Sequence, residues 1–376
     1  MCSVVASSNL EMSLRLLVEM EELGFSPKME IAQNLIILAA ELGYPRLAID
    51  LTYNFEASSV RKLDGKVWES CLAASAESYY KDGVVSMWPK VVQEYKMTLD
   101  EGLCLNALHT AGRHGLPDLA MEIFRTIKSI GIPLREHHFA PILEAAARTG
   151  RVKDAFSVLS LMRANHIVPE SATAHPIFQA LQESPASVDA AWDVLEELHK
   201  DNETIDILAI NVIIQASISH GDLQRAIGIY QSISRFGLKP NVDTFNALLS
   251  GCIAARNREL GDRLLTDMRE GGVVPDAPTY ERLVVLCLTA PTYEDAFFYL
   301  EEMKAADHFP PYSVYEAIIR RCISEGDSRY QLALQELEEF GYQVAPRLQE
   351  LIDSHAQSHS GERESTFDEV AARRRP

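Results

Sequence analysis

Three cysteines recur at one interval in the C-terminal half of the chain. Cys252, Cys287 and Cys322 are 35 residues apart. Thiols can bind a metal or form a disulfide, but this spacing places them at equivalent positions of successive copies of one unit. Helices of neighbouring copies pack about 8–10 Å apart, which is too far for a disulfide. The spacing therefore predicts buried, free thiols that pack as small apolar side chains.

Other side chains with reactive groups do not combine into a site. Cys2, Cys71 and Cys104 have no partner at metal-ligand spacing, and His355 and His359 have no glutamate at the spacing of a zinc protease. Adjacent glutamates on expected second helices, such as Glu301 and Glu302, are interpreted as solvated. No Gly-rich phosphate loop is present. We therefore expect no catalytic residue, no metal site, no cofactor and no small-molecule substrate, and we expect that the chain is not an enzyme.

The composition sets further limits. The chain has 376 residues, of which 47% are apolar, and this excludes disorder of the whole chain. No apolar run reaches the ~18 residues that a membrane span needs, and six cysteines are too few for a disulfide scaffold. The net charge is −19, a sign that opposes non-specific binding to nucleic acid.

Two sets of residues repeat with a period near 35, the kind of signal that identifies repeat architectures. One set is proline, usually two or three residues after a small residue. The other is a small residue in the middle of each unit. The prolines are Pro27, Pro133, Pro169, Pro240, Pro275, Pro310 and Pro346. The small residues are Ala48, Ala120, Ala155, Ala191, Ala226, Gly261, Ala296 and Ala333. The small residues are expected where two helices approach closely.

Each unit has the pattern of two helices. In 242–254 the apolar residues follow the helical spacing i, i+3, i+4, i+7, and 223–233 repeats that pattern. Gly237 suits a helix end that needs a positive φ, and Pro240 prevents continuation. Because one hairpin cannot bury its apolar faces alone, we predict an all-α fold, a right-handed α-solenoid of stacked two-helix repeats.

The period also predicts the organisation of the chain. Residues 1–28 form an incomplete repeat that supplies a second helix, residues 29–346 form the array, and residues 347–376 form a short helical end and a disordered polar tail. About nine repeats are expected. Their ranges are 29–64, 65–100, 101–135, 136–170, 171–206, 207–241, 242–276, 277–311 and 312–346.

These hairpins resemble the pentatricopeptide repeat family. The unit 242–276 opens with TFNALL at 244–249 and closes with GGVVPD at 271–276, and the unit 207–241 closes with GLKPN at 237–241. The related tetratricopeptide family, which binds peptides, has a period of 34 residues. The resemblance implies binding of single-stranded RNA in mitochondria or chloroplasts, with about one base read by each repeat.

The resemblance also implies which residues read a base: the fifth residue of the first helix and the last residue of the repeat. Asn246 with Asp276 matches a uridine-preferring pair, and Asn211 with Asn241 matches a pyrimidine-preferring pair. His175 occupies the reading position of 171–206, with Asp206 at its end. The remaining pairs depart from the code: Leu105 with Arg135, Ala140 with Glu170, Glu281 with Pro311, and Glu316 with Pro346.

Two functions remain open at this point. The net charge is +2 for 207–241 but −7 for 171–206, so RNA contact is expected to centre on 207–276. The first hypothesis is an organellar, most simply mitochondrial, protein that holds single-stranded RNA for processing, stabilisation or translation. The alternative is a scaffold or assembly factor that contacts protein partners and no RNA. Protein partners are expected under both.

The first residues carry no visible import signal. Met1 falls inside a repeat, and the first 28 residues contain more acidic than basic side chains, unlike a mitochondrial presequence. Two interpretations follow. The sequence is part of a longer gene product, which we favour, or the protein stays in the cytosol and its half-repeat acts as a cap. The mitochondrial assignment therefore rests on the resemblance.

Overall fold

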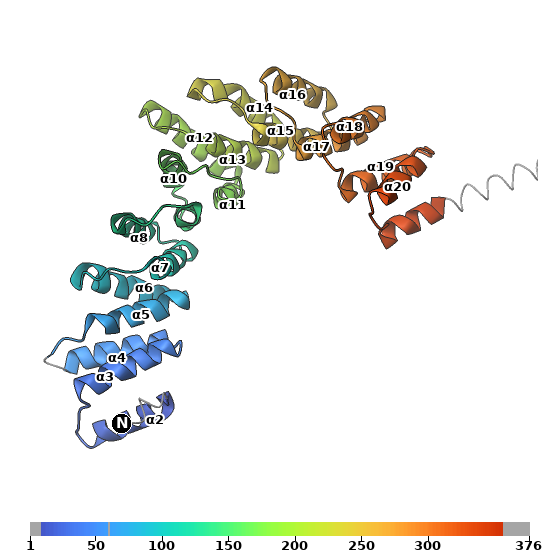
Figure 1. Cartoon of the computed structure of the whole chain (residues 1–376). Helices are drawn as coiled ribbons and strands as arrows, with labels where there is room; N and C mark the ends of the chain where they lie inside the picture. The colour runs from blue at the N-terminus through green and yellow to red at the C-terminus, as the bar shows by residue number, and fades with distance from the viewer. Residues whose placement is uncertain (1–8, 59–60, 356–376) are drawn as a thin grey trace, which may run out of the picture. The chain divides into compact units, whose positions relative to one another are not determined.

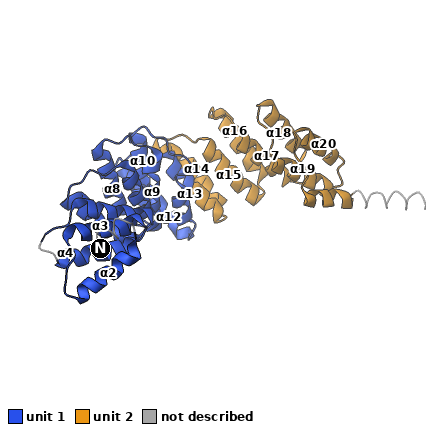
Figure 2. Cartoon of the chain, turned by 60° about the horizontal axis from the view of Figure 1, so that its bottom comes forward, with its two compact units in different colours: residues 1–212 blue, residues 213–376 orange. Residues whose placement is uncertain are grey.

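The computed structural model describes residues 9–58 and 61–355, and these residues form helices joined by short turns (Figure 1). The chain divides into two compact units, residues 1–212 and 213–376 (Figure 2), and the division falls inside α13. The disordered tail predicted beyond 355 lies outside the described residues. Within the described part of the chain, no helix combines the length and the apolar character that a bilayer span requires.

The first helices recur along the chain at intervals close to the period of the sequence. Seven of the nine predicted units begin with a first helix at or next to the first residue of the unit. These helices are α3 (Met29–Glu41), α5 (Gly65–Glu77), α7 (Glu101–Arg113), α13 (Ile207–Ser219), α15 (Val242–Ala255), α17 (Ala277–Leu288) and α19 (Tyr312–Ser324). The prediction of an all-α fold made of two-helix repeats is therefore confirmed.

Each first helix is followed by a second one. The second helices are α4 (Pro45–Ser58), α6 (Lys81–Pro89) with the π-helix η1 (Lys90–Glu94), α8 (Pro117–Ile130), α10 (Val152–Ala164), α12 (Pro185–Lys200), α14 (Leu223–Ser232) with the short helix η3 (Ile233–Phe236), α16 (Arg258–Glu270), α18 (Glu294–Ala305) and α20 (Tyr330–Glu339). Before the first full repeat, α2 (Leu10–Glu22) packs against α3. Residues 346–355 form a further helix.

Two first helices start late, and proline explains why. In 136–170 a short 3-10 turn, η2 (Glu136–His138), precedes α9 (Ala140–Arg148), and in 171–206 a turn precedes α11 (His175–Leu181). Both units carry proline as their sixth residue, Pro141 and Pro176. Proline lacks the N–H that would bond four residues back, so a helix can begin only just before it.

The first helices of consecutive repeats pack against each other, and the small residues in the second helices allow close approach. Within the units, α3 contacts α5, α7 contacts α9, and α15 contacts α17. The recurring small residues are all buried, for example Ala120 and Ala296. A Cβ added to Gly261 would lie 2.2 Å from Cδ2 of Leu286 in the next repeat. The close approach predicted from the spacing is therefore present.

Two local predictions are confirmed as well. Gly237 ends the second helix of its repeat with φ 70°, in the left-handed region that glycine tolerates. Cys252, Cys287 and Cys322 are buried and free. Burial raises the pKa of each of these thiols to about 11, so they remain protonated and packed among apolar side chains at neutral pH.

Candidate nucleic-acid interface

The strongest predicted base-reading residues, Asn246 and Asp276, lie in contact. Asn246 is the fifth residue of α15, and Asp276 is the N-cap of α17 in the next repeat. Nδ2 of Asn246 donates a hydrogen bond to Oδ1 of Asp276 at 3.1 Å. We call these two residues the reading pair. They meet because α15 and α17 pack side by side, so that the N-terminal turns of the two helices lie next to each other.

Thr279 completes the arrangement. Its backbone N–H donates to Oδ1 of Asp276 at 2.8 Å, which caps α17. Its Oγ1 lies 2.9 Å from Oδ1 of Asn246 and 2.6 Å from Oδ1 of Asp276, so its single hydroxyl proton is shared between two acceptors. The backbone N–H of Asp276 donates to the same hydroxyl at 3.3 Å. Three residues from two repeats thus fix each other.

This network orients the groups that would meet a base. Burial alone would raise the pKa of Asp276, but the hydrogen bonds from Thr279 and Asn246 outweigh it and hold the pKa below its usual value. The carboxylate therefore stays charged and orients the Asn246 amide with Nδ2 toward Asp276 and Oδ1 toward Thr279. One amide proton and one lone pair of Asn246 remain for a ligand. Asn246 is 7% exposed, so only a narrow edge is accessible.

The second predicted pair is arranged differently. Asn211 is fully buried in α13, so a base reaches it only if neighbouring side chains move. Asn241 is the N-cap of α15, and its Oδ1 accepts from the backbone N–H of Thr244 at 3.0 Å. Asn241 and Asp276 are therefore both N-caps. The fifth residues of their repeats differ in exposure: Asn211 is fully buried, and Asn246 is 7% exposed. Arg225, one of the cations behind the net charge of +2 in 207–241, lies 3.6 Å from Asp222.

The side chains of His175 and Asp206 bond to different partners. His175 is exposed at the start of α11, where its Nε2 lies 3.0 Å from Nε2 of Gln179. Asp206 is buried, its carboxylate accepts from Arg163, and its Oδ1 accepts the N–H of Leu208 at 2.8 Å. The carboxylate of Asp206 is thus engaged away from His175.

The remaining reading positions offer little to a base. Leu105 and Ala140 are half-buried and have no polar side-chain atom. Glu316 accepts two hydrogen bonds from Arg320, at 2.9 and 2.6 Å, so its carboxylate is already paired within its own helix. In the described structure, hydrogen-bonding chemistry suited to a base is best developed at the reading pair.

One cluster, Glu101 with His137 and His138, has the composition of a metal site. Nε2 of His138 lies 3.4 Å, and Nε2 of His137 3.7 Å, from Oε1 of Glu101. However, Nδ1 of buried His138 accepts the N–H of Arg135 at 3.0 Å. The proton of the neutral ring must then be on Nε2, which leaves no lone pair there for a metal. The cluster fits a polar contact between two repeats, with Glu101 beside both imidazoles, better than a ligand set.

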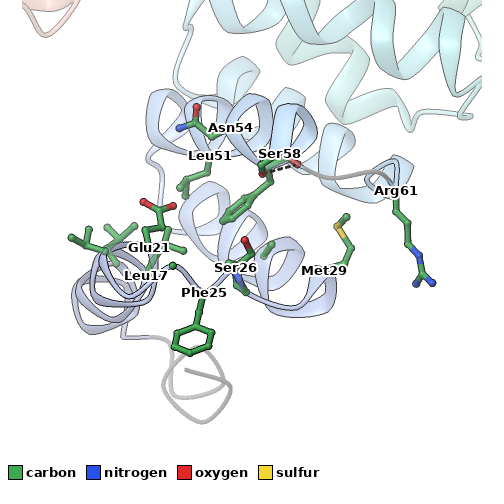
Figure 3. Close-up of a pocket in the computed structure, with 15 residues that line it drawn as sticks. Leu17, Glu21, Phe25, Ser26, Met29, Leu51, Asn54, Ser58 and Arg61 are labelled. Atoms are coloured by element: carbon green, nitrogen blue, oxygen red, sulfur yellow. Dashed lines mark hydrogen bonds between the residues drawn. The ribbon is translucent and has the colours of Figure 1, made fainter.

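A groove of about 870 Å³ lies between α2, α3 and α4 of the first unit (Figure 3). Its lining mixes apolar side chains, including Leu17, Leu51 and Phe55, with polar and charged ones such as Glu21. Phe25, which also lines it, is 64% exposed. Exposed apolar side chains beside charged ones suit contact with a segment of another protein.

Thr279 was not identified from the sequence as a functional residue, although its signal was present. The last residue of one repeat and the third residue of the next read Asn241 and Thr244, then Asp276 and Thr279. Both pairs form capping boxes in the structure. Asparagine or aspartate followed three residues later by threonine therefore marks the repeats in which the last residue is fixed by a cap.

Comparisons with known proteins agree with the repeat assignment. Residues 101–233 match the model described as "Pentatricopeptide repeat-containing protein", and residues 243–273 match the model described as "PPR repeat". The human mitochondrial pentatricopeptide repeat-containing protein 1 is 22% identical over 139 residues, which are 36% of this chain and 20% of that protein. A chloroplastic pentatricopeptide repeat-containing protein of Arabidopsis thaliana is 31% identical over 71 residues, which are 19% of this chain and 11% of that protein.

A solved structure is also similar in part. Yeast Rmd9p in complex with a 16-nucleotide target RNA aligns with a TM-score of 0.46 and 13% identity, over 97% of this chain and 77% of that one. The matched region spans about a fifth of the length of the human relative, and about a tenth of the Arabidopsis one.

Proposed function

The chain belongs to the pentatricopeptide repeat family, and from this premise we propose that it binds single-stranded RNA and holds one base at the reading pair. The observation that carries the proposal is the hydrogen bond between Asn246 and Asp276, fixed by Thr279. These are the two positions at which the family resemblance expects a base to be read. A preformed donor and acceptor discriminate between bases because the wrong base leaves them unpaired.

The preferred base follows from the same pair. The resemblance assigns uridine to asparagine followed by aspartate. With the Asn246 amide oriented by Asp276, the open edge presents one donor and one acceptor, as recognition of a Watson–Crick edge in single-stranded RNA requires. A good bidentate base contact discriminates by about 1–3 kcal/mol, a range known from DNA readout. One such contact favours a base and does not by itself specify a transcript.

We place this activity in an organelle, in the processing, stabilisation or translation of RNA. The human relative is named as mitochondrial and the Arabidopsis relative as chloroplastic. We favour the mitochondrion, as the sequence hypothesis did. Fractionation of cells that express the full-length gene product, with import tested by protease protection, measures this directly.

The alternative, a protein scaffold without RNA contact, is favoured by one observation: the groove between α2, α3 and α4, with exposed Phe25 in its lining. A groove that mixes apolar and polar side chains is suited to an amphipathic helix of a partner protein. It lies in the first unit, whereas the reading pair lies in the second. The two functions therefore use different residues, and variants can separate them.

Filter binding with single-stranded oligonucleotides of one base each, at 50 and 200 mM salt, tests the proposal. The unchanged protein is expected to prefer oligouridine and to bind less tightly at the higher salt. Asn246→Ala should remove about 1–3 kcal/mol of that preference. Gln335→Ala is the matched control, because Gln335 carries an exposed amide on a second helix of the same unit and bonds Glu339 of its own helix. If the unchanged protein binds no oligonucleotide at 50 mM salt, the result contradicts RNA binding and favours the scaffold function.

A further inference from the structure

Binding of a polynucleotide needs cations that can reach its phosphates, and most cations of the second unit are already paired. Among its described residues, carboxylates lie within 4 Å of most arginines. The pairs are Arg225 with Asp222, Arg258 with Asp262 and Asp295, Arg269 with Glu302, Arg320 with Glu316, Arg321 with Glu325, and Arg329 with Asp327. Each of these cations would have to leave its partner to bind a phosphate.

Arg282 in α17 is different. Its Nε donates to Oγ of Ser250 at 2.9 Å, and its Nη1 donates to the carbonyl of Pro278 at 2.8 Å. No carboxylate of the described residues is recorded within 4 Å of its guanidinium, including that of its chain neighbour Glu281. The side chain is half-exposed. Two of its five N–H groups are thus engaged with neutral oxygens, and three remain for a ligand.

An arginine that binds a phosphate should have its side chain held in place while its positive charge is not neutralised by a carboxylate. A flexible surface arginine loses side-chain entropy when it binds, about 2 kcal/mol for complete immobilisation. Arg282 has already lost part of this freedom through its two hydrogen bonds. Exposed arginines of the same unit, such as Arg235 and Arg263, have no recorded hydrogen bond that would fix them in this way.

The position of Arg282 is next to the reading pair. It follows Thr279 by three residues in α17, and it reaches across to Ser250, one turn after Asn246 in α15. Oγ of Ser250 in turn donates to the backbone carbonyl of Asn246 at 3.0 Å. The charge of Arg282 also contributes to the lowered pKa of Asp276. A nucleotide whose base meets Asn246 would therefore have its backbone near this guanidinium.

We propose that Arg282 binds a phosphodiester group of the nucleotide whose base is held by the reading pair. This inference rests on the proposed RNA binding and names the cation that serves it. The planar guanidinium matches phosphate oxygens in a bidentate geometry that lysine cannot reproduce. The sixth residue is Ala247 in the preceding repeat and Ala317 in the following one, so the contact belongs to one nucleotide and not to every repeat.

A purely structural role would be a link between α15 and α17 through Ser250. The two roles differ in their dependence on salt, because each phosphate contact on a single strand contributes about 0.7 to the slope of log K against log salt concentration. A lost helix–helix hydrogen bond lowers stability and leaves this slope unchanged. The slope is therefore the measurement that distinguishes a phosphate contact from a packing contact.

The experiment compares Arg282→Gln with Arg320→Gln by oligouridine binding at four salt concentrations between 50 and 300 mM. Both variants lower the net charge by one unit, but Arg320 is paired with Glu316. Arg282→Gln should reduce the slope by about 0.7 and weaken binding most at low salt, while Arg320→Gln should keep the original slope. Arg282→Lys should restore the slope but not the full affinity, because the bidentate geometry is lost.

Two results would overturn the inference, and they are distinguishable. If the unchanged protein binds oligouridine and Arg282→Gln keeps its slope, Arg282 contacts no phosphate while the proposed function stands. If the unchanged protein binds no RNA at 50 mM salt, both proposals fail together. Thermal unfolding of each variant shows whether it is folded, and the slope of a folded fraction remains interpretable because it does not depend on the fraction that is active.

Discussion

Repeats 171–206 and 242–276 have similar lengths but place their reading positions in different surroundings. In 242–276 the first helix begins at Val242, so Asn246 lies inside the helix and meets Asp276 of the following cap. In 171–206 the first helix begins at His175 itself, so the reading residue is the first helical residue and is exposed. The same position in the repeat thus gives a fixed amide in one case and an exposed imidazole in the other.

The difference begins with one residue. The sixth residue is Pro176 in one repeat and Ala247 in the other. A helix that started at the beginning of 171–206 would need the N–H of residue 176, and proline has none. The cap differs as well, since Glu170 stands where Asn241 caps α15. The comparison shows that a base-reading pair requires an uninterrupted first turn and a short capping side chain.

The largest effect is expected from removing the hydroxyl of Thr279, the third residue of the repeat that follows 242–276. Thr279→Val deletes the cap partner of Asp276 and leaves Oδ1 of Asn246 without its donor. We expect a loss of about 1–2 kcal/mol in the free energy of unfolding, the upper range for a cap. Urea unfolding followed by circular dichroism measures it.

Thr173→Val is the matched control, because Thr173 is the third residue of 171–206. Its hydroxyl bonds the carboxylate of Glu136, which is half-exposed and can accept water instead. We expect a loss of less than about 1 kcal/mol. If both variants lose the same free energy of unfolding, the network at the reading pair stabilises the protein no more than the single hydrogen bond of Thr173. That result would contradict the proposed difference between the two repeats.

Much of the difference between repeats 171–206 and 242–276 could be predicted from the sequence, and part of it could not. The period of 35 predicted the starts of α15 and α17 and the burial of Cys252, because one hairpin is copied with few changes. The late start of α11 could have been predicted from Pro176. The burial of Asn211 could not, because the side chains that cover it come from packing between helices and not from the pattern of one repeat.

The repeat 136–170, which like 171–206 has a late first helix, and the reading pair should respond to acid in different pH ranges. Burial, and then the neighbouring His137, lower the pKa of His138 below its usual value, although Glu101 opposes this. The stability that neutral His138 contributes is therefore present above the unfolded pKa of about 6.5 and is lost as the pH falls toward the folded pKa. Protonation of Nδ1 would also break its bond with the N–H of Arg135.

Asp276 has a lowered pKa as well, so its contribution is present above the unfolded value of about 3.9. Acidification from pH 7.5 to 5.5 should thus weaken α9 and leave α17 unchanged. Amide hydrogen exchange of the two helices at both pH values, corrected for intrinsic rates, measures this. His138→Asn keeps an acceptor for Arg135 and should reduce the change in α9, and the remainder comes from His109 of α7, whose pKa is also lowered by burial. Equal sensitivity of α17 would contradict the assignment.

The smallest effect, and the sharpest test of the comparison, concerns Pro176. Pro176→Ala restores the missing N–H and should let α11 begin up to one turn earlier, with added amide protection at residues 174–176. The stability should change by only a few tenths of a kcal/mol, because the gain in helix offsets the greater freedom of the unfolded chain. Pro185→Ala is the control, since Pro185 already sits in the first turn of α12 behind the cap Ser184 and blocks no extension. If residues 174–176 gain no protection, the late start of α11 comes from Glu170 and the missing cap, and a second change, Glu170→Asp, should then be required to extend the helix.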